Sequence, residues 1–273
     1  MRVSEFVRRA AAITAAIAIC GAAGLAQAPA PAQTPAPTFE PSVGQAGKDV
    51  VWVPTPQSLV DKMLDLAEIK PGELHMDLGS GDGRTVITAA KRGATAIGIE
   101  YNPDMVELSK RNAAAAGVSA KATFMKADLF ETDFSKAQVI TMFLLPSINM
   151  KLRPTILNLK PGTRIVSNTF TMEDWQPDMT ATVEDDCTSW CTALLWIVPA
   201  KVAGSWRLPD GTLTLKQEFQ QVSGTLGGQV ITDAKLRGDT LTFSAKGKPY
   251  TVRVLGDVMS GVGEKAWWGK KVS

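Results

Sequence analysis

The pattern of apolar and polar residues divides the chain into two regions with different periods. From residue 49 to about residue 200, runs with helical spacing alternate with short apolar runs of the kind that form buried strands. This alternation predicts a parallel sheet with helices on both faces. After residue 200, short alternating runs are separated by Asp-Gly, Gly-Gly and Gly-Asp pairs. These runs predict a small antiparallel β meander, or a half-open barrel, as a second domain.

The elements of the first region follow one another with short connections. A helix is expected after Thr55-Pro56, with Thr55 as its N-cap, and it should end near Lys70. The other expected helices span residues 84–91, 103–116 and 148–159, and the expected strands span residues 73–78, 94–100, 122–126, 138–144 and 163–168. Two further strand-like runs span residues 181–184 and 193–198. In the second region the expected strands span residues 204–208, 212–219, 241–244 and 250–254, with Trp206, Trp267 and Trp268 in the core.

The N-terminal residues have the composition of an export signal. Basic residues are followed by an alanine-rich apolar run and then by small residues, which suits cleavage after Ala26. A membrane anchor is the lesser alternative, because the run is short and alanine-rich compared with a span of about 20 residues. We therefore expect a signal peptide (1–26), a Pro/Ala-rich linker (27–47), an α/β domain (48–200) and a β meander domain (201–273) in an exported, periplasmic protein.

The charge balance limits the partners of the exported chain. Loss of residues 1–26 removes three arginines and one glutamate, so that 29 basic and 27 acidic residues become 26 of each. A near-neutral chain without a basic run does not attract nucleic acid or anionic lipid strongly. We therefore expect no nucleic-acid partner and no stable membrane span, and the sequence leaves the oligomeric state open.

Cysteine usage gives a second indication of the compartment. Cys187 and Cys191 remain after cleavage and lie between the strand-like runs 181–184 and 193–198. In an oxidising compartment they can form a disulfide that closes the tip of a hairpin, with two unpaired thiols as the alternative. The single histidine, His75, lies far away in the sequence and inside an expected strand, where a packed core residue is more common than a catalyst. We therefore expect no metal site.

A glycine-rich loop follows the first expected strand and precedes a helix. At this place in an α/β sheet the backbone binds ligands. The residues are Asp77-Leu78-Gly79-Ser80-Gly81-Asp82-Gly83-Arg84. A dinucleotide loop needs a third glycine where Arg84 stands, and the Asp82 carboxylate would repel a diphosphate. The loop therefore favours a ligand other than NAD.

The segment Asp77 to Gly83 resembles the first motif of class I methyltransferases that use S-adenosylmethionine. The resemblance implies a Rossmann-like fold and a cofactor that carries an ammonium, a carboxylate and a sulfonium. In that interpretation Asp77 accepts from the ammonium, and the N–H groups of the loop meet the carboxylate. The resemblance implies further that Glu100 accepts from the ribose hydroxyls and Asp128 from the adenine amino group. The implied cofactor-binding set is Asp77, Gly79, Ser80, Gly81, Gly83, Glu100, Tyr101, Asn102, Asp128 and Leu129.

A narrower likeness concerns the acceptor of the methyl group. Trp52-Val53-Pro54-Thr55-Pro56, Phe143-Leu144-Leu145-Pro146-Ser147 and Leu159-Lys160-Pro161-Gly162-Thr163-Arg164 are similar to segments of a group that includes protein-lysine methyltransferases of mitochondrial inner-membrane proteins. This likeness implies a protein lysine as acceptor. Candidate residues on the acceptor side are Trp52, Thr55, Phe143, Ser147 and Asn149, and none of them is a convincing general base.

Two other functions are compatible with parts of the sequence. An exported, non-catalytic protein could keep the fold as a scaffold while its β domain binds a partner. The acidic residues and glycines of the expected cofactor site are all present, which argues against a loss of cofactor binding. A nicotinamide dehydrogenase is weakened by the glycine spacing.

Overall fold

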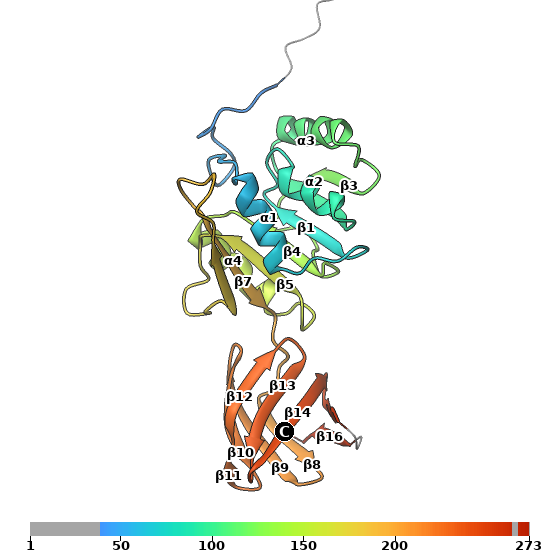
Figure 1. Cartoon of the computed structure of the whole chain (residues 1–273), viewed down its shortest axis with the longest axis vertical. Helices are drawn as coiled ribbons and strands as arrows, with labels where there is room; N and C mark the ends of the chain where they lie inside the picture. Colours follow the sequence, from blue (N-terminus) through green and yellow to red (C-terminus); the bar gives the residue numbers. More distant parts are fainter. Residues whose placement is uncertain (1–38, 264–266, 273) are drawn as a thin grey trace, which may run out of the picture. The chain divides into compact units, whose positions relative to one another are not determined.

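The computed structural model describes residues 39–263 and 267–272 (Figure 1). The expected signal peptide and residues 27–38 of the expected linker lie outside these ranges. Within them, no helix has the length and apolar character needed to span a bilayer.

The first sheet has seven strands in the order β3-β2-β1-β4-β5-β7-β6. Its strands are β1 (Leu74–Leu78), β2 (Thr95–Glu100), β3 (Ala122–Lys126), β4 (Val139–Met142), β5 (Arg164–Asn168), β6 (Met179–Thr182) and β7 (Thr192–Ile197). The strands β1 to β5 are parallel, as the sequence predicts. At the edge, β7 runs antiparallel to β6, which confirms the expected hairpin, and antiparallel to β5, so the sheet is mixed rather than parallel throughout. β6 and β7 are joined by a short loop, and a connection of this kind permits only antiparallel pairing.

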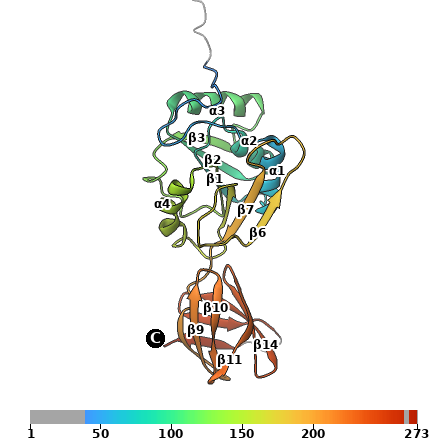
Figure 2. The ribbon, with the colours of Figure 1, turned by 90° about the vertical axis from the view of Figure 1, so that its left-hand side faces the viewer.

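Four helices cover the two faces of this sheet. They are α1 (Gln57–Leu66), α2 (Arg84–Lys91), α3 (Pro103–Ala115) and α4 (Pro146–Ile156). Figures 1 and 2 show α1 and α4 on opposite sides of the sheet. Apolar side chains of α2 and α3 pack with those of β2 and β3, α1 packs over β4, β5 and β7, and α4 packs on the opposite face. The expected helices on both faces are therefore present.

Two expectations about the start of the folded chain are wrong. Pro56 occupies the N-cap of α1 without a side-chain cap, and the Thr55 hydroxyl instead accepts from Asn168 Nδ2 at 3.3 Å. Order also begins before residue 48. Gly44 N donates to Trp52 O at 2.9 Å and Trp52 N donates to Gln45 O at 2.8 Å, so the end of the expected linker folds into a small hairpin.

The second sheet has nine strands in the order β11-β10-β9-β8-β16-β15-β14-β13-β12, which Figure 2 shows as a strongly curved sheet. Its strands are β8 (Gly204–Leu208), β9 (Gly211–Glu218), β10 (Gln221–Leu226), β11 (Gln229–Val230), β12 (Thr232–Arg237), β13 (Thr240–Ala245), β14 (Lys248–Leu255), β15 (Val258–Gly261) and β16 (Trp268–Lys271). The last strand pairs with β8, so the meander folds back on its own beginning. The expected antiparallel β domain is confirmed, with more strands than the sequence pattern predicts.

The tryptophans of this sheet lie in different environments. Trp206 is fully buried, and its Nε1 donates to Val202 O at 2.8 Å. Trp267 is half-buried at the edge of the same core. Trp268 is 70% exposed, so its expected place in the core is wrong. Its neighbour Gly269 is the buried residue, because side chains alternate between the two faces of a strand.

Replacement of Trp206 by alanine should destabilise the second sheet by about 3–5 kcal/mol, because it leaves a large cavity in a packed core. Urea unfolding of the full chain, followed by tryptophan fluorescence, measures this loss. The matched control is Trp268→Ala, which should change the free energy of unfolding by about 0.5 kcal/mol or less. Equal losses in the two variants would contradict the assignment of Trp206 to the core.

Candidate functional site

A cavity of about 560 Å³ opens at the carboxyl ends of the parallel strands of the seven-stranded sheet. The strand order reverses between β1 and β4, and loops that follow β1, β2 and β3 line one half of the cavity. Loops that follow β4 and β5 line the other half, together with the loop that precedes β7. A crevice at the point of reversal is where open α/β sheets bind their ligands.

The glycine loop lies at the bottom of the first half. Gly79, Gly81 and Gly83 have φ values of 79°, 54° and 83°, a region that favours glycine. A Cβ atom on Gly81 would lie 2.7 Å from Trp52 Nε1, so the close approach of the tryptophan also requires glycine. Gly83 does not line the cavity, contrary to its place in the predicted set. A Cβ atom there would lie 2.7 Å from the Phe124 ring, so its smallness serves the packing of β3.

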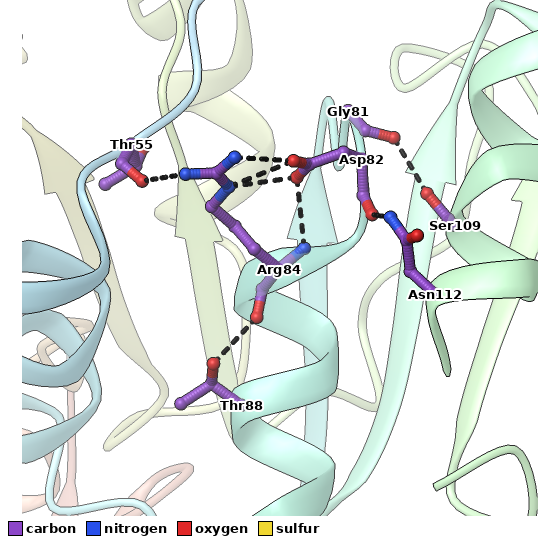
Figure 3. Close-up of polar contacts among 7 residues, drawn as sticks. All are labelled: Thr55, Gly81, Asp82, Arg84, Thr88, Ser109 and Asn112. Atoms are coloured by element: carbon purple, nitrogen blue, oxygen red, sulfur yellow. Dashed lines mark hydrogen bonds and ion pairs between the residues drawn. The ribbon is translucent and has the colours of Figure 1, made fainter. Parts of the chain in front are cut away.

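Side chains of α3 hold the glycine loop from behind (Figure 3). Ser109 Oγ donates to Gly81 O at 2.8 Å, and Asn112 Nδ2 donates to Asp82 O at 2.9 Å. The amides of the loop are also engaged, since Gly79 N and Ser80 N both donate to Ile99 O. The expectation that these amides receive a carboxylate is therefore wrong for Gly79 and Ser80.

Arg84 joins the glycine loop to the segment before α1 (Figure 3). Its Nη2 lies 2.6 Å from Asp82 Oδ2, and its Nη1 donates to Thr55 O at 2.9 Å. Arg84 thus compensates the charge of Asp82, so the expected repulsion of a diphosphate by Asp82 is weakened. The glycine spacing remains as the argument against a dinucleotide.

Asp77 is a buried carboxylate at the end of β1. It is 6% exposed, and its Oδ1 accepts from Thr141 Oγ1 at 2.5 Å. The pKa of Asp77 is raised to about 7, mainly by burial; the Thr141 hydrogen bond opposes this rise, and the nearby Glu100 and Asp82 carboxylates add to it. A buried carboxylate near other carboxylates favours a cationic ligand.

His75 completes this chain of hydrogen bonds. Its Nε2 lies 2.8 Å from Thr141 Oγ1. Because the Thr141 proton goes to Asp77, we assign the proton of neutral His75 to Nε2. Burial lowers the pKa of His75 to about 3, so the ring stays neutral. The histidine is a buried core residue, as the sequence predicts, and it fixes the orientation of the Thr141 hydroxyl.

The carboxylates after β2 and β3 lie in the same half of the cavity. Glu100 accepts from Gly81 N at 3.0 Å and from Asn102 N at 2.9 Å. Asn102 caps α3 through Asp104 N. Tyr101, Asn102, Asp128 and Leu129 all line the cavity with Glu100, and the structure thus brings the predicted set together, Gly83 excepted.

Sequence reasoning missed Lys48, which covers this half of the cavity. Its Nζ bonds to Asp128 Oδ2 and lies 4.7 Å from the centroid of the Tyr101 ring. Phe130 N donates to the other carboxylate oxygen of Asp128 at 2.9 Å. These contacts hold the pKa of Asp128 below its usual value, with the Lys48 hydrogen bond as the largest cause. No pattern marks Lys48 in the sequence, because it lies at the border of the segment expected to be linker.

The acceptor-side candidates divide into two groups. Trp52, Thr55 and Phe143 line the cavity. Ser147 is exposed on α4 away from it, and Asn149 is fully buried and donates to Phe170 O at 3.1 Å. The prediction that these two residues face the acceptor is therefore wrong. Phe170 and Trp190 line the cavity and were missed, although the position of Trp190 beside Cys191 was a usable signal.

The donors and acceptors of the first half fit S-adenosylmethionine. Asp77 keeps a second carboxylate oxygen that accepts no hydrogen bond from the described residues, which suits an ammonium. Ser80 Oγ is buried without a partner in the described part of the chain, and it packs against Gly98 of β2. The glycine loop leaves room for a ligand that comes close to the backbone.

Comparisons with known proteins agree with this geometry. Residues 77–179 match the family model described as the ANTKMT methyltransferase domain. A protein-lysine N-methyltransferase of Saccharolobus islandicus (strain REY15A) is 42% identical over 139 residues, which are 50% of this chain and 86% of that protein. The adenine nucleotide translocase lysine N-methyltransferase of Mus musculus is 37% identical over 120 residues, which are 43% of this chain and 52% of that protein.

A solved structure gives the same result. The RNA methyltransferase of Salinibacter ruber in complex with S-adenosyl-L-homocysteine is 46% identical, with a TM-score of 0.51. The match covers 55% of this chain and 96% of that one. These likenesses favour an enzyme over a non-catalytic scaffold and S-adenosylmethionine over a nicotinamide cofactor. The chain belongs to the class I S-adenosylmethionine-dependent methyltransferases.

Proposed function

We propose that this methyltransferase acts on the ε-amino group of a lysine in a protein substrate. The observation that carries the proposal is the division of the cavity. Asp77, Glu100 and Asp128 lie in one half, and the other half is lined by aromatic side chains. An apolar, aromatic half suits the long apolar stem of a lysine. The names of the relatives, which include protein-lysine N-methyltransferases, support the same acceptor.

The first half of the cavity holds and orients the cofactor in this proposal. S-adenosylmethionine supplies a methyl group on a sulfonium centre when it is bound. Asp77 accepts from the ammonium, and Glu100 accepts from the ribose hydroxyls. Asp128 accepts from the adenine amino group through a remaining lone pair, since each of its oxygens already bonds to one donor, Lys48 at Oδ2 and Phe130 N at Oδ1.

The second half prepares the acceptor by excluding water. A lysine has a reference pKa near 10.4, and it must lose a proton before its nitrogen can attack. The carboxylates among the described lining residues belong to the cofactor half or to the covering segment that contains Asp49. Desolvation by apolar walls lowers the pKa of an ammonium. Positioning and desolvation, rather than a general base, thus account for the reactivity.

RNA is a second candidate acceptor. The observation in its favour is the likeness to the Salinibacter ruber RNA methyltransferase. Against it stands the near-neutral charge of residues 27–273, because RNA binding depends on contacts between basic residues and phosphates. A protein acceptor therefore agrees better with the charge of the chain.

We also propose that the protein is exported and acts in the periplasm. The basic and apolar pattern of residues 1–26 supports this location. The disulfide between Cys187 and Cys191 agrees with it, since disulfides persist in oxidising compartments. The cofactor would then have to reach the same compartment.

Incubation of the full chain with S-adenosylmethionine labelled on the methyl group should transfer label to protein. Periplasmic protein and total RNA from the same cells are the two acceptors to compare. Acid hydrolysis of the labelled protein should release N-methyllysine. Label that enters only RNA would contradict the lysine proposal, and a Glu100→Gln variant controls for contaminating enzymes.

The affinity for S-adenosylmethionine should fall about tenfold for each pH unit below about 7, because protonation of Asp77 removes the partner of the cofactor ammonium. The ammonium itself stays charged over this range, since α-amino groups titrate near 7.7–8.0, about one unit higher. Calorimetric titration at several pH values measures the slope.

The variant Asp77→Asn should bind the cofactor about 10- to 100-fold more weakly and lose this slope, since a hydrogen bond to a charged group is worth about 1.5–3 kcal/mol. Without cofactor, the raised pKa of Asp77 means that stability falls as pH rises from the value of a free aspartate through about 7, and Asp77→Asn should remove that decline. Asp133→Asn, an exposed carboxylate outside the cavity, is the control and should behave like the wild type.

Fractionation of cells that express the full chain should place it in the periplasm, with a mature N-terminus after residue 26. The physical reason is the export signal in residues 1–26. Sequencing of the N-terminus and a cytosolic marker enzyme provide the measurement and its control. A cytosolic pool that retains Met1 would refute the proposal of export.

A further inference from the structure

Three aromatic side chains meet at adjacent strand ends in the second half of the cavity. Phe143 follows β4, Phe170 follows β5, and Trp190 precedes β7. The antiparallel pairing of β5 with β7 brings the last two together, because Asn168 pairs with Ala193 and Thr169 N donates to Thr192 O at 2.7 Å. Residues far apart in the sequence thus form one wall.

The rings contact one another and leave part of their surface toward the cavity. The ring centroids of Phe143 and Phe170 lie 5.8 Å apart with an interplanar angle of 18°. Those of Phe143 and Trp190 lie 6.0 Å apart at 59°. All three line the cavity, and Trp190 is 43% exposed. Such distances are typical of aromatic pairs, and exposed ring faces attract cations.

The loop that carries Trp190 is held at several points. A disulfide joins Cys187 to Cys191, and Ser58 Oγ of α1 donates to Asp185 O at 3.1 Å. Trp190 itself has a φ of 55°, a conformation that is uncommon for a bulky residue. Backbone of this kind persists only when the surroundings impose it, and such residues cluster at functional sites.

Charge near the loop is consistent with a cationic ligand. Glu184, Asp185 and Asp186 precede Cys187 and are exposed. A negative rim raises the local concentration of a basic segment. The aromatic wall itself contains no charged group, so it can desolvate an amine and still attract the positive charge that the amine acquires.

We propose that Phe143, Phe170 and Trp190 form a subsite for an alkylammonium acceptor, a lysine side chain or its N-methylated forms, and that the Cys187–Cys191 disulfide holds Trp190 in that subsite. The inference rests on the proposed function, whose acceptor it specifies.

The aromatic wall acts on the charge that the transfer creates. The lone pair of the amine forms the new N–C bond, the C–S bond breaks, and its electron pair remains on sulfur. Positive charge moves from sulfur to nitrogen in this step, and the methylammonium afterwards loses a proton to solvent if further methylation follows. Ring faces beside the nitrogen stabilise that charge as it develops.

The test uses two probes of equal shape and different charge. One is the amide of Nε-trimethyllysine, and the other is its neutral analogue with carbon in place of the quaternary nitrogen. Binding to the full chain, saturated with S-adenosylhomocysteine, is measured by calorimetry. The wild type should bind the cation about 3- to 30-fold more tightly than the neutral analogue, the range expected for a desolvated cation over aromatic faces. Equal binding of the two probes would overturn the subsite.

Variants locate the effect within the loop. Trp190→Ala should lose the preference for the cation, Trp190→Phe should keep most of it, and Cys187→Ser/Cys191→Ser should lose it in part. Trp268→Ala, an exposed tryptophan of the other sheet, is the matched control and should change nothing. Wild-type preference in the double serine variant would overturn the role assigned to the disulfide.

A separate measurement distinguishes failure of this inference from failure of the proposed function. Each variant should bind S-adenosylhomocysteine like the wild type, because Trp190 and the cysteines are not among the residues predicted to bind the cofactor. Normal binding of S-adenosylhomocysteine without cation preference in the wild type overturns the acceptor subsite alone. Loss of S-adenosylhomocysteine binding in the wild type overturns the proposed function as well.

Discussion

The hydrogen bond from Thr141 to Asp77 connects β1 and β4, the two parallel strands between which the strand order of the sheet reverses. Asp77 on β1 lies opposite Thr141 on β4, and His75 holds the Thr141 hydroxyl from the other side. Loops on the β1 side carry Glu100 and Asp128, and loops on the β4 side carry the aromatic wall. A buried carboxylate must be hydrogen-bonded to be tolerated. This bond therefore lies at the boundary between the polar and aromatic halves of the cavity.

The same carboxylate links binding to stability. Burial next to other acidic groups makes its ionised form unfavourable in the free protein, and a cation beside it removes that disadvantage. A ligand that binds only the folded chain stabilises it by mass action. The buried carboxylate thus destabilises the unliganded protein locally, and the same burial makes the site selective for a positively charged group. The amides of Gly79 and Ser80 already donate to Ile99 O, so the Asp77 carboxylate is the main group that selects the charge of the ligand.

Local sequence patterns predict the cofactor half of the site better than the acceptor half. Asp77, Glu100 and Asp128 each lie at or just after the end of a parallel strand, and parallel strands end at one edge, so their meeting can be inferred from the chain. Trp190 depends on the antiparallel pairing of β7 with β5, and Lys48 depends on a hairpin that begins within the residues expected to be linker. Ser147 and Asn149 were misjudged because the helix that begins at Pro146 turns them away from the cavity. Long-range strand pairing decides the case of Trp190, and local backbone geometry decides the others; the alternating pattern encodes neither.

The wall that Trp190 provides sits on a hairpin tip rather than on the parallel strands that carry the glycine loop. The residues between Cys187 and Cys191 are exposed and do not pack in the core. Loops of this kind tolerate changes of sequence and length that a central strand does not. Selection, or an engineer, can therefore exchange the tip to suit another acceptor while the cofactor machinery stays as it is, which makes the disulfide-closed hairpin a replaceable module of this enzyme.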